Sequence, residues 1–177
     1  MIETDRLILR GIHSEADREQ LALVNGDPRV GAWLAGTLDR AGSDAMADRI
    51  NAHIAEHGFG FWAAELKAER RIVGLIGLMV VKPDALPVGP AIEMGWRLAP
   101  ETWGTGLASE GAAAARDWAF AHLATDELIA FTARGNLASQ AVMRKIGMTP
   151  DPTRDFDHPK LTPDHPLRAH VVYAIAR

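Results

Sequence analysis

Hydrophobic and polar residues alternate between residues 91 and 98, with the period of a β-strand that has one apolar face. The apolar positions are Ile92, Met94, Trp96 and Leu98. Pro100 follows closely, and because proline has no backbone N–H to donate, we expect the strand to end before it. From residue 107 onward nearly all residues are helix formers, and a buried face at helical spacing is expected at Leu107, Gly111, Ala114 and Trp118.

Similar patterns predict the elements on either side of this strand–loop–helix unit. Before it we expect a strand at residues 7–10, a helix from Ser14 to about Asn25, a helix from 43 to 57 ending at Gly58, and strands at 59–66 and 72–81. After it we expect a strand at 128–132, a helix between Asn136 and Gly147, and a closing strand at 171–175.

The order of these elements predicts the fold class. A helix connects the strands at 91–98 and 128–132, so these two strands are expected to be parallel, whereas the earlier strands form an antiparallel meander. We therefore predict an α/β fold with a mixed sheet, mostly antiparallel with one parallel strand pair, flanked by helices. The 177 residues contain no internal repeat and no linker, which predicts a single domain over residues 1–177.

Composition limits the classes of function. The net charge of −4 gives no support to a nucleic-acid partner, which would favour a basic face. The absence of cysteine excludes a disulfide framework, a cysteine nucleophile and a cysteine zinc site. The charged start, MIETDRLILR, lacks the apolar core of a signal peptide, and no stretch is long enough to span a membrane. We expect a cytoplasmic protein without a membrane partner.

The loop before the predicted central helix has the features of an anion site. The first turn of a helix has N–H groups without partners and a partial positive charge, and glycines at 104 and 106 let the backbone wrap a phosphate. The spacing fits neither common nucleotide loop, because no GK[ST] is present and Ser109 replaces the third glycine of GxGxxG. Alternatively, the two glycines only cap the helix.

The stretch EMGWRLAPETWGTGLASEGAA resembles the acetyl-CoA-binding motif of the GNAT superfamily of N-acetyltransferases, [QR]xxGx[GA], and is most similar to the branch with the ribosomal-protein N-terminal acetyltransferases. Gly104 and Gly106 match its glycines, whereas Glu101 replaces the Gln or Arg. The resemblance implies acetyl-CoA as co-substrate. Its pyrophosphate would bind the loop residues Trp103, Gly104, Thr105, Gly106, Leu107 and Ala108.

The same resemblance implies where the acyl arm lies. In the GNAT fold the strand at 91–98 splays from its parallel neighbour, and the arm would bind the main chain of Trp96, Arg97 and Leu98 in that gap. Gly95 interrupts the alternation, which indicates a bulge or the close approach of another backbone, or else only loose packing. Trp33 and Leu34 would border the acceptor site, or pack in the core or against a partner.

Residues 132–148 carry a second motif. Asn136 and Gly147 have the types expected of helix caps, which alone would explain both. The pattern TxxxNxxSxxVMxKxGM also resembles the second cofactor motif of the same GNAT branch, in which Asn136 would contact the pantetheine arm and Ser139 would approach the thioester sulfur. Other branches have a tyrosine where this chain has Met143, and the one tyrosine, Tyr173, lies far along the chain.

These motifs predict an N-acetyltransferase in which a primary amine, a protein N-terminus or a small molecule, attacks acetyl-CoA directly in a ternary complex. An amine is mostly protonated at neutral pH, so a base is needed. Glu93, on the same strand face as Gly95 and Arg97, is the candidate base, and an ion pair with Arg97 is the alternative. Ser139 is the candidate acid. Homodimers are common in families of this kind, so a homodimer is one option.

Two other functions stay open at this point. His53, Glu56 and His57 match the HxxEH pattern of zinc hydrolases, with a third ligand from Asp155, Asp157 or His158, although a solvated helix end explains them more simply and no metal is predicted. A non-catalytic acyl-CoA-binding protein would keep the phosphate loop without turnover. The proline-rich loop at 150–166 is either functional or held in place by Asp157 and His158.

Overall fold

The computed structural model describes residues 1–34 and 36–177. The first half contains β1 (Ile2–Glu3), β2 (Leu7–Arg10), α1 (Glu15–Gly26), α2 (Pro28–Gly31), α3 (Arg40–His57), β3 (Phe61–Leu66), β4 (Arg71–Val81) and β5 (Ala91–Leu98). The second half contains η1 (Pro100–Thr102), α4 (Leu107–His122), β6 (Glu127–Ala133), α5 (Leu137–Lys145), β7 (Thr149–Pro150), η2 (Pro152–Arg154), β8 (Phe156–Asp157) and β9 (Ala169–Ala176).

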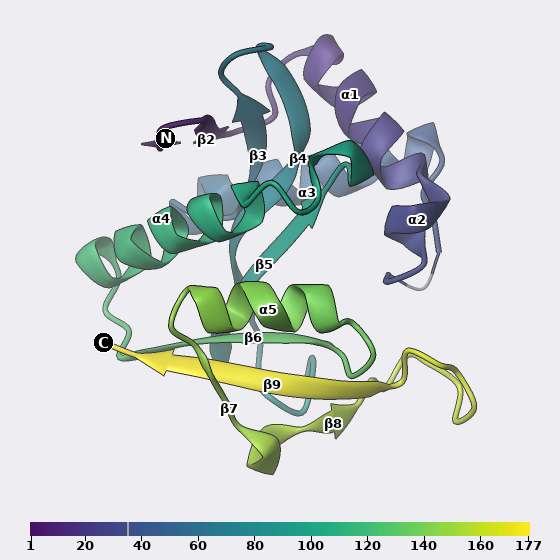
Figure 1. Ribbon diagram of the computed structural model, residues 1–177, viewed down its shortest axis with the longest axis vertical. Coiled ribbons are helices and arrows are strands. Elements are labelled where there is room, and N and C mark those ends of the chain that lie inside the picture. The colour runs from purple at the N-terminus through teal and green to yellow at the C-terminus, as the bar shows by residue number, and fades with distance from the viewer. Residues whose placement is uncertain (35) are drawn as a thin grey trace.

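The strands form one mixed sheet in the order β1-β2-β3-β4-β5-β6-β9-β7, and β8 pairs with β9 (Figure 1). Strands β3 to β5 form the predicted antiparallel meander, which β2 and the unpredicted β1 extend, and β5 and β6 form the predicted parallel pair. The closing strand β9 lies between β6 and β7, antiparallel to both. The predicted α/β class with one parallel strand pair is therefore confirmed.

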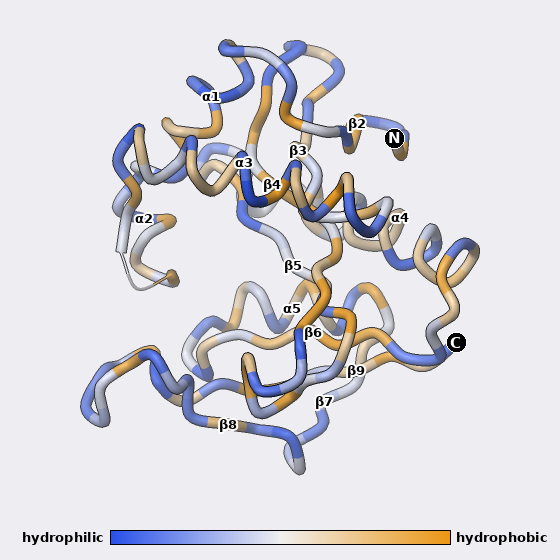
Figure 2. Tube along the Cα trace, turned by 180° about the vertical axis from the view of Figure 1, so that it is seen from behind, coloured by the Kyte–Doolittle hydropathy of each residue, from blue (hydrophilic) through white to orange (hydrophobic). Residues whose placement is uncertain are grey.

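Helices cover both faces of the sheet. Helices α4 and α5 share a core with the face of β2–β5 that carries Ile76, Met94 and Leu98. Helices α1 and α3 cover the opposite face, where Leu21 and Ile50 pack against Leu75. Figure 2 shows the hydrophobic residues of β4 and β6 running through the middle of the molecule. The face of β5 with Glu93, Gly95 and Arg97 is consequently turned toward α1 and α3, because alternate residues point to opposite faces.

In the first half of the chain, some elements differ from the sequence-based prediction. Helix α3 begins at Arg40 rather than 43, because Asp39 caps it by accepting a hydrogen bond from Gly42 N at 2.7 Å. The short helix α2 was not predicted; Asp27 caps it and proline stands in its first turn. Strand β3 begins at Phe61, two residues after the predicted start.

The buried face of α4 is rotated from the predicted one. Its buried residues are Leu107, Gly111, Ala112, Ala115 and Ala119, whereas Ala114 and Trp118 are only half-buried. Small residues face the sheet because the helix lies close to it: a Cβ on Gly111 would lie 2.5 Å from Ile76 Cδ1. The larger Trp118 packs edge-on against Trp62 at the border of the core, with ring centroids 5.3 Å apart.

Within the described part of the chain, none of the helices has both the length and the apolar character needed to cross a membrane.

Candidate active site

Strands β5 and β6 separate just after they meet. Their parallel pairing has one registered residue pair, Glu93 with Ile129, although β5 continues to Leu98 and β6 to Ala133. A cavity of about 920 Å³ opens where the strands part. Residues from α3, both diverging strands, the start of α4, α5 and the loop before β9 line it. The splayed parallel pair expected from the resemblance is therefore present, and it forms a wall of this cavity.

The backbone of β5 offers hydrogen-bonding groups to this cavity. Ala99 N donates to Val73 O at 2.8 Å, and in the continuous antiparallel register the residues that bond to β4 alternate with those that do not. The backbone N–H and C=O groups of Arg97 therefore face β4. Those of Trp96 and Leu98 point to the other side, toward the gap between β5 and β6. Leu98 O already accepts from Trp103 Nε1 at 2.8 Å. Of the three predicted residues, Trp96 is thus the best placed to offer backbone hydrogen bonds in the gap between β5 and β6.

Gly95 does not form the bulge that the sequence suggested. The register between β4 and β5 runs without a shift past Gly95, which pairs with Gly77. A Cβ on Gly95 would lie 2.8 Å from Phe61 Cε1 and 2.9 Å from Phe61 Cζ, closer than real Cβ contacts. Glycine is therefore needed because the Phe61 ring from β3 lies over this position. The close neighbour is an aromatic side chain and not another backbone.

The loop before α4 has the geometry of an anion site. Gly104 has φ +76° and Gly106, the N-cap of α4, has φ +87°, both in the left-handed region that favours glycine. No side chain of the described residues caps the first N–H groups of α4. These N–H groups and the dipole of a 16-residue helix are available to an anion.

Most predicted loop residues line the cavity. Among them are Trp103, Gly104, Gly106, Leu107 and Ala108. Thr105 is not a lining residue: its hydroxyl donates to Thr102 O at 2.6 Å, and its carbonyl accepts from Arg6 Nη1 at 3.0 Å. Arg6 also pairs with Glu110 at 2.6 Å, which holds the loop against the first turn of α4. Thr105 therefore supports the shape of the loop with its side chain.

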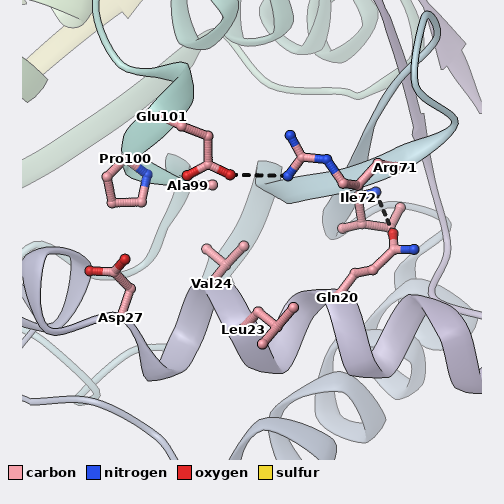
Figure 3. A pocket seen from close by; sticks show the side chains of 9 residues that line it. All are labelled: Gln20, Leu23, Val24, Asp27, Arg71, Ile72, Ala99, Pro100 and Glu101. Carbon is pink, nitrogen blue, oxygen red and sulfur yellow. Dashed lines mark hydrogen bonds and ion pairs between the residues drawn. The ribbon is translucent and has the colours of Figure 1, made fainter.

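Glu101, which replaces the Gln or Arg of the family pattern, points away from the loop. Its carboxylate pairs with Arg71 at 3.0 Å in a separate cavity of about 300 Å³ between α1, the start of β4 and η1 (Figure 3). In the same view, Gln20 Oε1 accepts from Ile72 N at 2.7 Å. The departure from the pattern at residue 101 therefore leaves the backbone of the anion site intact.

Asn136 and Ser139 both line the large cavity, and Asn136 also has the capping role that the sequence allowed. Asn136 Oδ1 accepts from Ser139 N at 3.1 Å, and its Nδ2 donates to Thr132 Oγ1 at 3.2 Å. The side-chain oxygen is thus used by the helix, which leaves one amide hydrogen for a ligand. Ser139 is half-buried, and its hydroxyl forms no hydrogen bond with the described residues.

Glu93 lies in the cavity wall at the point where β5 and β6 separate. Removal from water raises the pKa of its carboxyl group to about 8. Among the described residues it forms no ion pair with Arg97, the alternative reading of Glu93, because Arg97 Nη1 donates to Asn25 Oδ1 at 2.7 Å instead. A carboxyl group that changes protonation near neutral pH is suited to acid–base catalysis.

Tyr173 is not available to the reacting atoms. It is 4% exposed beneath α5, where its hydroxyl accepts from Arg144 Nη1 at 2.8 Å and donates to Gln140 Oε1 at 3.3 Å. Met143, at the position where other branches have a tyrosine, is 1% exposed and belongs to the core. Ser139 is therefore the hydroxyl-bearing residue of α5 that lines the cavity, and Thr132 of the neighbouring β6 also lies in its wall.

His53, the first histidine of the HxxEH pattern, has structural hydrogen-bond partners at both ring nitrogens. His53 Nδ1 bonds to Phe59 O at 2.8 Å, and its Nε2 accepts from Val80 N at 3.2 Å, so both ring nitrogens are engaged in joining α3 to the segment before β3 and to β4. Burial lowers the pKa of His53 and favours this neutral form. Over residues 1–34 and 36–177, no cluster of three or more potential ligands is arranged for a metal ion. The structure thus removes the basis of the zinc hydrolase alternative.

The loop at 150–166 is held in place by its carboxylates, and its functional role stays a prediction. Asp155 accepts from Val172 N at 3.0 Å and pairs with Arg134, while Asp157 pairs with Arg168 at 3.1 Å, so these carboxylates hold the loop to β9. His158 and His170, with ring centroids 5.1 Å apart, line the cavity. The loop is therefore attached by its aspartates and contributes His158 to the cavity wall, beside His170 of β9.

Several lining residues have no signal in the sequence. Arg49, Phe61 and Met79 look like ordinary helix and strand residues, and only the fold brings them to the cavity. Trp33 and Leu34 also line the cavity, with 40% and 42% of their surfaces exposed, so they do not pack in the core. Their contact with an acceptor stays a prediction.

A mixed sheet with one splayed parallel pair, and a glycine-rich anion loop beside the gap, define an acyl-CoA-dependent acyltransferase. Residues 6–149 match the family model described as an acetyltransferase (GNAT) domain. This protein therefore belongs to the GNAT family of acetyltransferases, and acetyl-CoA is its co-substrate.

Two known sequences and one solved structure are among the proteins similar to this chain. The chain is 28% identical over 145 residues to the uncharacterized protein YkkB of Bacillus subtilis (strain 168), which covers 82% of this chain and 83% of that protein. It is 33% identical over 106 residues to FsC-acetyl coenzyme A-N(2)-transacetylase of Aspergillus fumigatus, 56% of this chain but 43% of that protein. The crystal structure of an acetyltransferase from Agrobacterium tumefaciens str. C58 has a TM-score of 0.77 and 27% identity, covering 99% of this chain and 94% of that one.

Proposed function

We propose that this protein transfers the acetyl group of acetyl-CoA to the nitrogen of a primary amine, by direct attack in a ternary complex. The observation that carries the proposal is the position of Glu93: a carboxyl group without an ion-pair partner among the described residues, in the cavity wall beside the gap between β5 and β6. The fungal relative, named an N(2)-transacetylase, supports nitrogen as the acceptor atom.

The proposed reaction begins with proton removal. The carboxylate of Glu93 accepts a proton from the ammonium group of the acceptor, and the free amine attacks the thioester carbonyl. A nitrogen–carbon bond forms, the carbon–sulfur bond breaks, and CoA leaves as a thiolate. The thiolate takes a proton from Ser139 or water, and the donor regains it from the nitrogen, which loses its extra proton as the amide forms. The backbone of Trp96 would hold the acyl arm and polarise the carbonyl. The N–H groups of residues 104–108 would bind the pyrophosphate.

The chain does not need a covalent intermediate for this reaction. It has no cysteine, and the described residues around the gap offer a base but no activated nucleophile. Direct transfer is therefore the simplest mechanism that these side chains support. Membership of the ribosomal-protein N-terminal branch stays a prediction from the motifs.

The test is release of free thiol from acetyl-CoA in the presence of a panel of amines and N-terminal peptides, with mass spectrometry of the product. We expect an N-acetylated product with at least one amine, and a large loss of rate in Glu93→Gln with acetyl-CoA binding retained in calorimetry. Binding of acetyl-CoA without turnover on any amine would contradict the proposal and favour an acyl-CoA-binding protein.

A further inference from the structure

The charges that line the large cavity have the opposite sign to the protein as a whole. The chain has a net charge of −4, yet Glu93 is the one acidic residue among the described lining residues. The basic lining residues are Arg49, Arg97, Lys145 and Lys160. Because acetyl-CoA is itself an anion, its phosphates account for basic groups near the loop and α5. The phosphates do not account for the basic residues on the other side of the sheet.

Arg49 and Arg97 lie on that other side. Arg49 belongs to α3, and the side chain of Arg97 contacts α1 and α3, whereas the anion loop begins α4 on the opposite face. Arg97 is opposite Leu75 in the register of β4 and β5, and Leu75 packs in the cluster formed with α1 and α3. These two guanidinium groups therefore belong to the half of the cavity that α3 borders, where the acceptor would enter.

A buried polar network fixes one corner of the Arg97 guanidinium group. Arg97 Nη1 donates to Asn25 Oδ1 at 2.7 Å and contacts Met46 Sδ at 3.5 Å. Asn25 is 2% exposed, and its Nδ2 donates to Ser43 Oγ at 2.9 Å, where Ser43 is 1% exposed. Both amide atoms of Asn25 are thus used, so the network defines the orientation of the guanidinium group.

The rest of the guanidinium group has no partner among residues 1–34 and 36–177. Its Nε and Nη2 make no hydrogen bond, and no carboxylate forms an ion pair with it. Desolvation consequently lowers the pKa of Arg97, with no neighbouring anion to oppose the effect. An arginine stays charged in proteins, and its planar fork matches carboxylate and phosphate groups. A desolvated cation held rigidly without a counter-ion is costly unless a ligand supplies one.

Glu93 and Arg97 flank the same short stretch of β5. They point to the same face, on either side of Gly95, and residues four apart on a strand are separated by about 13 Å along the backbone. The ring of Phe61 lies over Gly95 between them. The site therefore presents a carboxyl group at one end and a guanidinium group at the other. A ligand with an amine and an anionic group would complement both ends.

We propose that the acceptor is a small amine that also carries an anionic group, a carboxylate or a phosphate, and that Arg97 binds this group while Glu93 faces the amine. The proposal rests on the proposed function and adds the chemical class of the acceptor. It makes Arg97 a specificity-determining residue and Asn25 its positioning residue. Polyamines fit poorly, because their additional positive charges would meet Arg97 and Arg49.

Matched pairs of acceptors test this proposal on the wild-type protein. Free-thiol release would be compared for L-amino acids against their carboxamides, and for phosphoethanolamine against ethanolamine, with spermidine as a cationic acceptor. We expect the anionic member of at least one pair to have a kcat/KM at least tenfold higher than its neutral partner. The pair that responds identifies the carboxylate or the phosphate. Equal or lower values for every anionic member would overturn the proposal.

The variant Arg97→Met tests the residue. We expect the ratio of kcat/KM between the anionic acceptor and its neutral partner to fall by roughly ten- to hundredfold, the effect of a lost charged hydrogen bond, mainly through KM. Arg97→Lys should recover part of the ratio. Arg71→Met is the matched control, because Arg71 pairs with Glu101 outside the large cavity. A ratio unchanged in Arg97→Met would overturn the assignment, even where overall activity drops.

The two proposals fail in different ways. If no amine of the panel is acetylated, the proposed transferase function is wrong and the acceptor class falls with it. If amines are acetylated without regard to their charge, the transferase function stands and only the acceptor class is wrong. If spermidine is the preferred acceptor, the basic groups serve acetyl-CoA alone.

Discussion

Phe61 and Gly95 are matched across three strands of the sheet. Phe61 pairs with Gly77, Gly77 pairs with Gly95, and the Phe61 ring lies where a Cβ on Gly95 would stand, 2.8 Å from Phe61 Cε1. The ring thus covers the middle of β5 between Glu93 and Arg97. The size of the side chain at residue 95 therefore controls where this part of the cavity wall lies.

Gly95→Ala is expected to destabilise the protein by about 1–3 kcal/mol, because the added methyl group forces the Phe61 ring to move. In a protein of this size, each kcal/mol lowers Tm by roughly 2–4 °C. Thermal unfolding would measure it. The double variant Gly95→Ala/Phe61→Leu should recover part of the loss, since the smaller side chain makes room. Strictly additive losses would show that the two residues are not coupled.

The pH dependence of catalysis should report Glu93. Its pKa is raised to about 8, so the fraction in the basic carboxylate form increases as pH rises through 8. We expect kcat/KM for the amine to increase over this range and level off above it, apart from the ionisation of the amine itself. In Glu93→Gln the increase in kcat/KM through pH 8 should disappear, whereas the pH dependence caused by ionisation of the amine should remain. An unaltered pH profile in the variant would rule out Glu93 as the base.

The same group makes stability depend on pH. The pKa of Glu93 is raised from 4.5 to about 8 on folding, so the folded state binds the proton more tightly and stability falls as pH rises between these values. Glutamine does not titrate. Glu93→Gln should therefore gain more Tm relative to wild type at pH 9 than at pH 5, measured by thermal unfolding. A difference independent of pH would contradict the raised pKa.

Binding of CoA should depend on the loop glycines. Gly104 and Gly106 have φ +76° and +87°, so a valine at either position would strain the backbone that presents the N–H groups. We expect Gly106→Val to weaken CoA binding by roughly tenfold or more in calorimetry. Glu101→Gln is the control, because Glu101 points into the separate cavity of Figure 3. Equal CoA affinity in Gly104→Val, Gly106→Val and wild type would show that the anion binds elsewhere.

Ser139→Ala is expected to lower kcat by roughly ten- to hundredfold, at the low end of acid–base effects, because a CoA thiolate leaves readily. The hydroxyl makes no hydrogen bond with the described residues, so its removal should leave Tm nearly unchanged. CoA affinity should also change little. Turnover at the wild-type rate would identify water as the proton donor.

The sequence was sufficient for features that depend on neighbouring residues. Alternation of apolar positions predicted β5, Asn136 predicted the cap of α5, and the glycines at 104 and 106 predicted the loop that begins α4. Each of these is decided by backbone geometry over a few residues. The order of the elements then predicted the parallel pair, because a helical crossover leaves few other arrangements.

Only the tertiary structure decided features that depend on residues far apart in the chain. The pairing of Arg97 with Asn25, the rotation of α4 that buries Ala112 and Ala115, and the position of β9 between β6 and β7 have no local signal. The pKa of Glu93 likewise follows from burial in a wall built by several elements. The chain alone therefore determines the local geometry of the loop that we propose binds CoA. The shape and charge of the acceptor half arise from side chains that meet only after folding.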